Sequence, residues 1–296
     1  MSPSEILQAI LVAVVWGLGF IAIKLGVGDM PPLLFSASRF AMAAFPAVLF
    51  LKPPAAPARI VIAYGLAIGV AQFSLLFIAI GEGMPAGLSS LLMQTQVIFT
   101  MLFAWAAMGE RPSGVQACGV AVAMAGLAVI ASEKLTGGVA GPFLLVIAAA
   151  ASWAAGNIIG KSAGRVDMLA FTTWSSLAAP LPLLALSFWF EGEAARSAIV
   201  HPGWRALLSA AFLGYGATLF GYSLWAHLLS RRPAAIVAPF SLLVPVVGFL
   251  AGWIVFGEQT SIVEFLGAGL ILLGIGWNVL GGRAMAKWRR GANPLP

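Results

Sequence analysis

The sequence predicts an all-α integral membrane protein of ten transmembrane helices, arranged as two inverted five-helix repeats. Three observations lead to this prediction: an apolar composition, a regular succession of apolar stretches, and two residue patterns that each occur twice. Hydrophobic residues make up 61% of the chain and charged residues only 9%, whereas a soluble domain carries roughly 25% charged residues. A globule of this size cannot hide so many apolar side chains in one core, so we expect them to face lipid.

Ten stretches are mainly apolar over about 20 residues, the length needed to cross the hydrocarbon layer of a bilayer. Prolines, glycines and clusters of charge separate them. The predicted spans are 5–26, 32–52, 59–81, 85–108, 114–131, 141–162, 168–190, 205–229, 233–256 and 261–282. The first stretch lacks the basic start and the cleavage site of a signal peptide, so we interpret it as a span.

Basic residues predict the orientation, because lysine and arginine are enriched in cytoplasmic loops. With a cytoplasmic N-terminus, eleven of them fall on the cytoplasmic side and three on the other. The eleven are Lys52, Arg59, Arg111, Lys161, Arg165, Arg231, Arg232, Arg283, Lys287, Arg289 and Arg290, and the three are Lys134, Arg196 and Arg205. Both termini are therefore predicted to be cytoplasmic, with a basic tail at 285–296. The net charge of +6 is thus explained by topology, and nucleic acid is not an expected partner.

Two patterns recur in the same order along the chain. A tryptophan followed eight positions later by a lysine occurs in WGLGFIAIK and again in WAAGNIIGK. A Pro-Ala pair opens a span that ends in Gly-Glu in both halves. The paired segments are 16–24 with 153–161, and 85–110 with 233–258.

These patterns divide the chain into a first five-helix repeat at 1–135 and a second at 140–284. Because five is an odd number, the second repeat begins on the opposite side of the membrane, so the repeat is inverted. Inverted repeats are typical of secondary transporters, whose substrate site lies near the midplane where the halves meet. Rocking of one half against the other would then give alternating access.

Polar and aromatic side chains near the middle of spans are candidates for substrate contact, because lipid offers them no hydrogen bonds. Gln94 and Gln96 enclose a third polar residue, and three in a row cannot all face one neighbouring helix, which favours a cavity. The candidate substrate-binding residues are Trp16, Arg39, Gln72, Gln94, Gln96, Trp153, Asn157, Tyr215, Tyr222, Ser241 and Pro245.

Several of these residues have an alternative structural interpretation. Gln72 could join helices. Asn157 lies one turn beyond Trp153 on the same helix face, where it would bind substrate or brace the opposing half. Pro245 frees a backbone carbonyl, for a substrate or merely for a kink.

Arg39 is the most informative charge, since it lies roughly 10 Å from the outer end of the second span by helix rise. A charge deep in a bilayer costs about 2.5–3.5 kcal/mol on insertion scales, so it is expected to pair or to serve a function. A guanidinium suits a carboxylate of the substrate. The structural alternative is pairing with Glu82 or with backbone carbonyls.

Further charges occupy matching positions near span ends. Lys24 and Lys161 close the first repeated pattern, and Lys24 could also reach a substrate anion from the outer face. Glu110 and Glu258 close the second pattern, where they would cap a helix or bind a basic residue across a closed gate. The candidate gate or structural residues are Lys24, Glu82, Glu110, Lys161 and Glu258.

An intramembrane enzyme would need a cluster of nucleophile and base, paired acids or metal ligands. The only histidines, His201 and His227, lie in a loop and near a span end, so no catalytic residue, cofactor or metal is expected. Cys118 is the only cysteine, so no intramolecular disulfide exists. Protons stay a candidate coupling ion, although no acid or histidine stands out as their carrier.

The chain resembles the drug/metabolite transporter superfamily, EamA-type, over about residues 5–282. The similar segments are WGLGF with the following lysine, SRF around Arg39, GMPAGLSSLLMQTQ, the Gly-Glu pairs and APFSLLVPVVG. Within that group VVWGLGFIAIKLGVGDMPPL, AQFSLLF and LLVPVVG are most similar to bacterial exporters of O-acetylserine and cysteine.

The resemblance implies a ten-helix carrier in the bacterial inner membrane that exports small amino-acid metabolites. It also implies a central cavity lined by spans one, three, four, six, eight and nine. A zwitterionic substrate fits a lining of amides and aromatic rings. Other amino acids, purines and amphipathic drugs are alternative cargoes.

Overall fold

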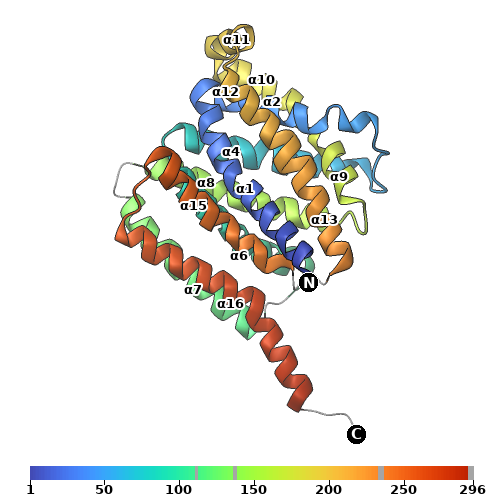
Figure 1. Cartoon of the computed structure of the whole chain (residues 1–296), viewed down its shortest axis with the longest axis vertical. Helices are drawn as coiled ribbons and strands as arrows, with labels where there is room; N and C mark the ends of the chain where they lie inside the picture. Colours follow the sequence, from blue (N-terminus) through green and yellow to red (C-terminus); the bar gives the residue numbers. More distant parts are fainter. Residues whose placement is uncertain (111–112, 136–138, 233–236, 293–296) are drawn as a thin grey trace.

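The computed structural model describes residues 1–110, 113–135, 139–232 and 237–292, and within them all regular structure is helical (Figure 1). Eight helical segments are long and apolar enough to cross a membrane. They are Pro3–Asp29, Pro32–Leu49, Ala58–Gly81, Ala86–Met108, Gly114–Lys134, Ala140–Lys161, Met168–Phe190 and Trp204–Leu228. Two shorter apolar helices follow, Phe240–Phe256 and Ile262–Trp277. The predicted all-α membrane class is confirmed. Eight of the predicted spans overlap the long segments, and the ninth and tenth overlap the two shorter helices.

The first half of the chain contains two uninterrupted membrane helices and three interrupted ones. Its elements are α1 (Pro3–Asp29), α2 (Pro32–Ala44), η1 (Ala47–Leu49), α3 (Ala58–Gly65), η2 (Leu66–Gln72), α4 (Phe73–Gly81), α5 (Ala86–Leu92), η3 (Met93–Thr95), α6 (Gln96–Met108) and α7 (Gly114–Lys134). The segments η1 and η3 are 3₁₀ turns, and η2 is a π-helix.

The second half of the chain has a similar succession of elements. Its elements are α8 (Ala140–Lys161), α9 (Met168–Ser176), α10 (Pro180–Phe190), α11 (Gly192–Val200), α12 (Trp204–Ala211), η4 (Phe212–Phe220), α13 (Gly221–Arg231), η5 (Ala238–Leu242), α15 (Leu243–Phe256) and α16 (Ile262–Ala292). Residues 233–236, the start of the predicted ninth span, lie outside the described residues. The helix α16 continues to Ala292, so the predicted tail begins as an extension of the last helix; residues 293–296 lie outside the described part.

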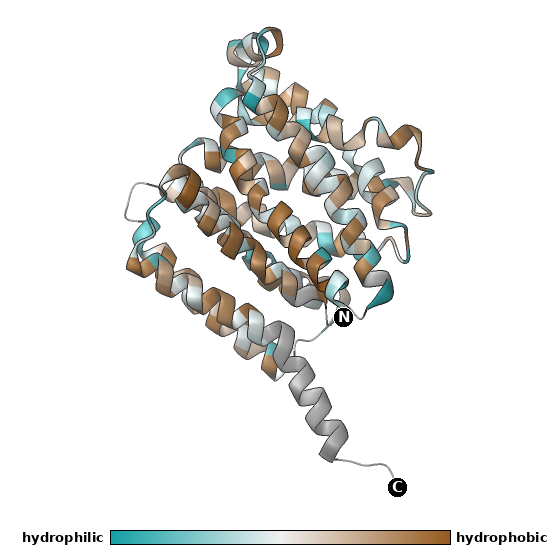
Figure 2. Ribbon diagram, viewed as in Figure 1, coloured by the Kyte–Doolittle hydropathy of each residue, from teal (hydrophilic) through white to brown (hydrophobic). Residues whose placement is uncertain are grey.

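The hydropathy of the side chains varies along the helices. Figure 2 shows hydrophilic residues gathered at helix ends and connections, with hydrophobic residues along the shafts. Large apolar side chains also point outward, such as Trp189, which is 83% exposed, and Ile254, Phe265 and Leu273. Exposure of so much apolar surface is unfavourable in water and is what contact with lipid tails requires.

Departures from α-helical geometry occur at corresponding places in the two halves. The π-helix η2 interrupts the third predicted span and the π-helix η4 the eighth. The 3₁₀ segments η3 and η5 likewise break the fourth and the ninth. Gly109 and Gly257, in the two Gly-Glu pairs, both end their helices at positive φ, where a residue without Cβ is favoured. The recurrence therefore extends from sequence to backbone geometry.

The start of α2 is capped by a side chain distant in sequence. Its N-cap residue, Pro31, offers no side-chain acceptor, although the first N–H groups of a helix need partners. Glu191 accepts hydrogen bonds from the amides of Leu33 and Leu34, at 2.7 and 3.1 Å. The connection that holds Glu191 also contains α11, a short helix that the predicted spans do not include.

The helices α7 and α16 form a close pair along one flank of the molecule (Figure 1). Glycines allow this approach, since a Cβ on Gly126 would lie 2.6 Å from the carbonyl oxygen of Gly267. Small residues at helix contacts are the usual way in which membrane helices pack closely. Near one end of the pair, Lys134 forms an ion pair with Glu264.

Replacing Gly274 by alanine is expected to destabilise this helix pair. The added Cβ would lie 2.5 Å from the backbone nitrogen of Ala123 and from the carbonyl oxygen of Gly119, and backbone atoms cannot turn away. Such overpacking costs about 1–3 kcal/mol, which should lower the melting temperature in detergent. Gly269→Ala is the matched control on the same helix, because nothing lies within 4 Å of its Cβ position. Equal melting temperatures for the two variants would contradict this account of the packing.

Candidate functional site

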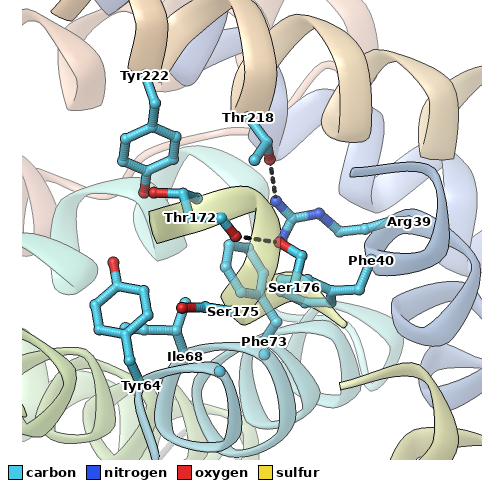
Figure 3. A pocket seen from close by; sticks show the side chains of 12 residues that line it. Arg39, Phe40, Tyr64, Ile68, Phe73, Thr172, Ser175, Ser176, Thr218 and Tyr222 are labelled. Carbon is cyan, nitrogen blue, oxygen red and sulfur yellow. Dashed lines mark hydrogen bonds between the residues drawn. The ribbon is translucent and has the colours of Figure 1, made fainter. Parts of the chain in front are cut away.

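A polar pocket lies between four helical segments, two from each half of the chain (Figure 3). The segments contain α2, the α3–η2–α4 rod, α9, and the η4–α13 rod, which correspond to the predicted spans two, three, seven and eight. The lining residues are Arg39, Phe40, Tyr64, Gly65, Ile68, Gly69, Phe73, Thr172, Ser175, Ser176, Thr218 and Tyr222. Both π-helices contribute to the wall, and π-segments are frequent at functional sites.

Arg39 supplies the positive charge of this pocket and is only 4% exposed. Its Nη2 donates to the hydroxyl oxygen of Thr218 at 2.7 Å, while Nε and Nη1 are buried without a hydrogen-bond partner among the described residues. The guanidinium lies over two aromatic rings, with Cζ 4.2 Å from the ring centroid of Phe40 and 4.0 Å from that of Phe73. These cation–π contacts hold the group in place without satisfying its N–H donors.

The alternative in which Arg39 pairs with Glu82 is wrong. Within the described residues the guanidinium forms no ion pair. Glu82 is exposed after the end of α4. No carboxylate in the described part of the chain therefore offsets the buried charge of Arg39.

Hydroxyl groups form the rest of the polar lining. The side-chain oxygens of Thr172 and Ser175 are buried without a partner among the described residues. The hydroxyls of Tyr64 and Tyr222 point toward each other across the pocket, as Figure 3 shows. Of the nine buried side-chain atoms without a partner among the described residues, four belong to Arg39, Thr172 and Ser175. Such groups are rare in folded proteins, which makes the pocket a candidate binding site.

A second polar cluster joins the two halves between the start of α6 and the last turns of α8. The side-chain nitrogen of Asn157 donates to the side-chain oxygen of Gln96 at 2.8 Å and to the hydroxyl of Thr100 at 3.0 Å. The Thr100 hydroxyl also bonds the same Gln96 oxygen, at 3.2 Å. Two predicted substrate contacts, Gln96 and Asn157, are thus bonded to each other in this conformation.

Trp16 connects α1 to the wall of the pocket. Its indole N–H donates to the carbonyl of Ala217, in the π-helix η4, at 2.9 Å. Its ring packs against Tyr222 and Trp225, at centroid distances of 5.5 and 5.3 Å. The helices approach closely at Gly221, where a Cβ would lie 2.6 Å from the Trp16 nitrogen.

Two ion pairs of the same kind lie at opposite ends of the α5–η3–α6 rod. At its N-terminal end, Lys24 of the first half binds Glu258 of the second at 2.6 Å. Just past its C-terminal end, Lys161 of the second half binds Glu110 of the first. Each ion pair therefore joins a lysine of one half to a glutamate of the other half. The four residues are the ones that close the two repeated sequence patterns.

The first of these pairs is the more elaborate. Glu258 also accepts the backbone N–H groups of Ala86 and Gly87, at 2.8 and 3.0 Å, and so caps α5, whose N-cap is a proline. Lys24 lies over the ring of Phe256, 4.5 Å from its centroid. A Cβ on Gly252 would lie 2.4 Å from the Glu258 carboxylate, so glycine is needed for this approach.

The remaining predicted residues take varied places. Gln72 and Gln94 are buried, in η2 and η3. Trp153 packs against a hydrophobic cluster that contains the pocket-lining Tyr64 and Ile68. Tyr215 is exposed and donates to the carbonyl of Phe45 at 3.2 Å. Ser241 lies in η5 and the buried Pro245 in α15; neither they nor Tyr215 line the pocket.

Five polar pocket residues escaped the sequence-based prediction: Tyr64, Thr172, Ser175, Ser176 and Thr218. One signal could have found Ser175. It is the eighth residue of α9, as Arg39 is the eighth residue of α2. The site of the buried charge in the first half is thus matched by a hydroxyl in the second.

The model of the EamA-like transporter family matches residues 3–132 and, a second time, residues 141–280. The chain belongs to this family. It is 40% identical over 298 residues to a protein of Escherichia coli named "Probable amino-acid metabolite efflux pump", with 98% of each chain covered. A protein of Salmonella typhimurium with the same name is 40% identical over 291 residues, covering 96% of this chain and 97% of that protein.

A solved crystal structure matches over 96% of this chain and 99% of its own, with a TM-score of 0.63 and 20% sequence identity. At this identity the match concerns the fold alone. The family and the names of the relatives point to a transporter rather than an enzyme, as the sequence predicts.

Proposed function

We propose that this protein is an inner-membrane secondary transporter that exports small amino-acid metabolites, of the cysteine and O-acetylserine kind, by alternating access. The observation that carries the proposal is the buried polar pocket between corresponding helices of two halves that each match the EamA-like transporter model. Relatives 40% identical over nearly the whole chain are named for amino-acid metabolite efflux. The proposed cargo agrees with the polar lining of the pocket and with the names of these relatives.

The proposed architecture is ten spans in two inverted repeats, at 1–135 and 140–284. Paired π-helices, paired 3₁₀ breaks and paired left-handed glycines support it. With five spans to each repeat the halves run in opposite directions, and the excess of basic residues places both termini in the cytoplasm.

Alternating access requires that each end of the protein can close in turn. The two ion pairs suit this task, because they lie at opposite ends of one rod of 23 residues, which is about 35 Å long. The side chains of Lys24 and Glu258 are 30% and 12% exposed, whereas those of Lys161 and Glu110 are both 51% exposed. In the proposed orientation the outer end is therefore closed and the cytoplasmic end is the more open.

Purified protein in liposomes provides the test of this function. We expect saturable uptake of labelled O-acetyl-L-serine and L-cysteine, above that of empty liposomes. An arm with an imposed pH gradient measures coupling to protons, and faster uptake with the gradient would identify protons as the coupling ion. Absence of transport of both compounds, with transport of another family cargo such as a purine, would overturn the proposed cargo.

A further inference from the structure

We propose that the Arg39 pocket is the subsite that binds the carboxylate of the transported molecule, with Arg39 as its counter-ion. This inference rests on the proposed transport function and deepens it, since it assigns one chemical group of the cargo to one place in the protein. From the sequence, Arg39 could bind a substrate carboxylate or pair with Glu82 or backbone carbonyls. The pocket adds the surroundings of the guanidinium and the side from which it faces a ligand.

The unmatched charge is the first argument. A buried guanidinium with two unpartnered nitrogens is costly, and within the described residues no carboxylate offsets it. Phe40 and Phe73 cover its faces and Thr218 takes one donor of Nη2. The remaining N–H donors of the guanidinium suit a planar anion with two oxygens, because a guanidinium can donate two parallel hydrogen bonds to the two oxygens of a carboxylate.

The position of the charge is the second argument. Arg39 enters the pocket from one side, and the hydroxyls of Tyr64, Thr172 and Tyr222 gather on the other (Figure 3). The corresponding position of the second half carries Ser175 in place of an arginine. The pocket is therefore positive at one end and neutral, with hydroxyl oxygens as acceptors, at the other. The cavity of about 20 Å³ has room for a group of about the size of one water, so in this conformation it is complementary to the carboxylate end of a small molecule rather than to the whole molecule.

The environment of the pocket is the third argument. It lies between α2 and α9, with both π-helices in its wall. A carboxylate that reaches Arg39 must leave water, and only a fixed counter-ion offsets the loss of its hydration. A methyl ester lacks the carboxylate charge and gains nothing from this counter-ion. The protein should therefore discriminate strongly between an acid and its ester.

The first measurement is a comparison of ligands on the unaltered protein. L-cysteine, O-acetyl-L-serine and a panel of other amino acids compete for uptake in liposomes, each against its methyl ester. The same compounds are tested for thermal stabilisation of the protein in detergent. We expect each effective acid to compete at least tenfold better than its ester, and to raise the melting temperature more than the ester does.

The second measurement uses variants. Arg39→Gln should abolish stabilisation by carboxylates and lower uptake at least tenfold, and Arg39→Lys should recover part of both. The control is Arg205→Gln, since Arg205 also lies near an aromatic ring, that of Trp204 at 5.6 Å, but is exposed outside the pocket. Should Arg39→Gln fail to fold, the comparison of acid with ester still decides.

The outcomes separate the two proposals. If acids and esters compete and stabilise equally, the carboxylate site is overturned while export of amino-acid metabolites can still hold. If no amino acid is transported but carboxylates still stabilise the wild type and not Arg39→Gln, the site holds and the proposed cargo fails. If no carboxylate has any effect on the wild type, the site is overturned.

Discussion

Replacement of Glu258 by alanine is expected to lower transport at least about tenfold and to destabilise the protein. The Glu258 carboxylate accepts hydrogen bonds from Lys24 and from two backbone N–H groups of α5. Its removal leaves these three half-buried donors without an acceptor. Removal of one partner of such a pair costs about 3 kcal/mol. Liposome uptake and the melting temperature in detergent measure the two effects.

Glu110→Ala is the matched control, because Glu110 occupies the corresponding position of the first half. Its ion pair with Lys161 is half-exposed, and exposed pairs contribute about 1 kcal/mol or less. We expect a smaller loss of stability there. An equal or larger loss in Glu110→Ala would contradict the view that the Lys24 end is the closed one.

The charge exchange Lys24→Glu with Glu258→Lys sharpens this test. The exchanged pair restores the attraction between the side chains, but a lysine at position 258 cannot accept the N–H groups of Ala86 and Gly87. It also places a cation at the positive end of α5. The double variant should therefore recover only part of the lost transport, and full recovery would mean that the cap contributes nothing.

The membrane helices were predictable because their signal is local. About 20 consecutive apolar residues between glycines, prolines and charges are enough to place a span, and the predicted 168–190 falls on Met168–Phe190. The ends were less certain, as the continuation of α16 to Ala292 shows. The cap of α2 by Glu191 could not be predicted, since it joins residues 158 positions apart whose proximity depends on the whole packing.

The pocket shows the same division between local and distant information. Arg39 and Tyr222 stood out because charged and aromatic polar groups are rare inside spans. Thr172 and Ser175 did not, because helical hydroxyls commonly bond their own backbone, as Ser176 does with the carbonyl of Thr172. Only the packing of α9 against α2 turns these hydroxyls into the far wall of a site. The pairing of Arg39 with Glu82 failed for the same reason, since distance along two helices does not say which faces meet.

The bond between Gln96 and Asn157 leads to a second large expected effect. Gln96→Leu and Asn157→Leu should each lower transport about tenfold and reduce stability, and the double variant should lose little more than either. The reason is that both substitutions remove the same hydrogen bond between the halves, so the losses are not additive. Such bonds in membranes contribute about 1 kcal/mol, and a double-mutant cycle on the melting temperature measures this coupling.

Kinetics distinguish a brace between the halves from two separate substrate contacts. A brace predicts coupled losses of stability and of maximal transport rate, with little change in KM. Independent contacts predict additive increases in KM at unchanged stability, which would contradict the bracing role. Thr100→Ser is the control, because it keeps the hydroxyl that bonds both amides, and it should behave like the wild type. The helix α6 belongs to the first half and α8 to the second. When the halves rock against each other, this hydrogen bond must either break or move with both helices. Its strength should therefore affect the transport rate.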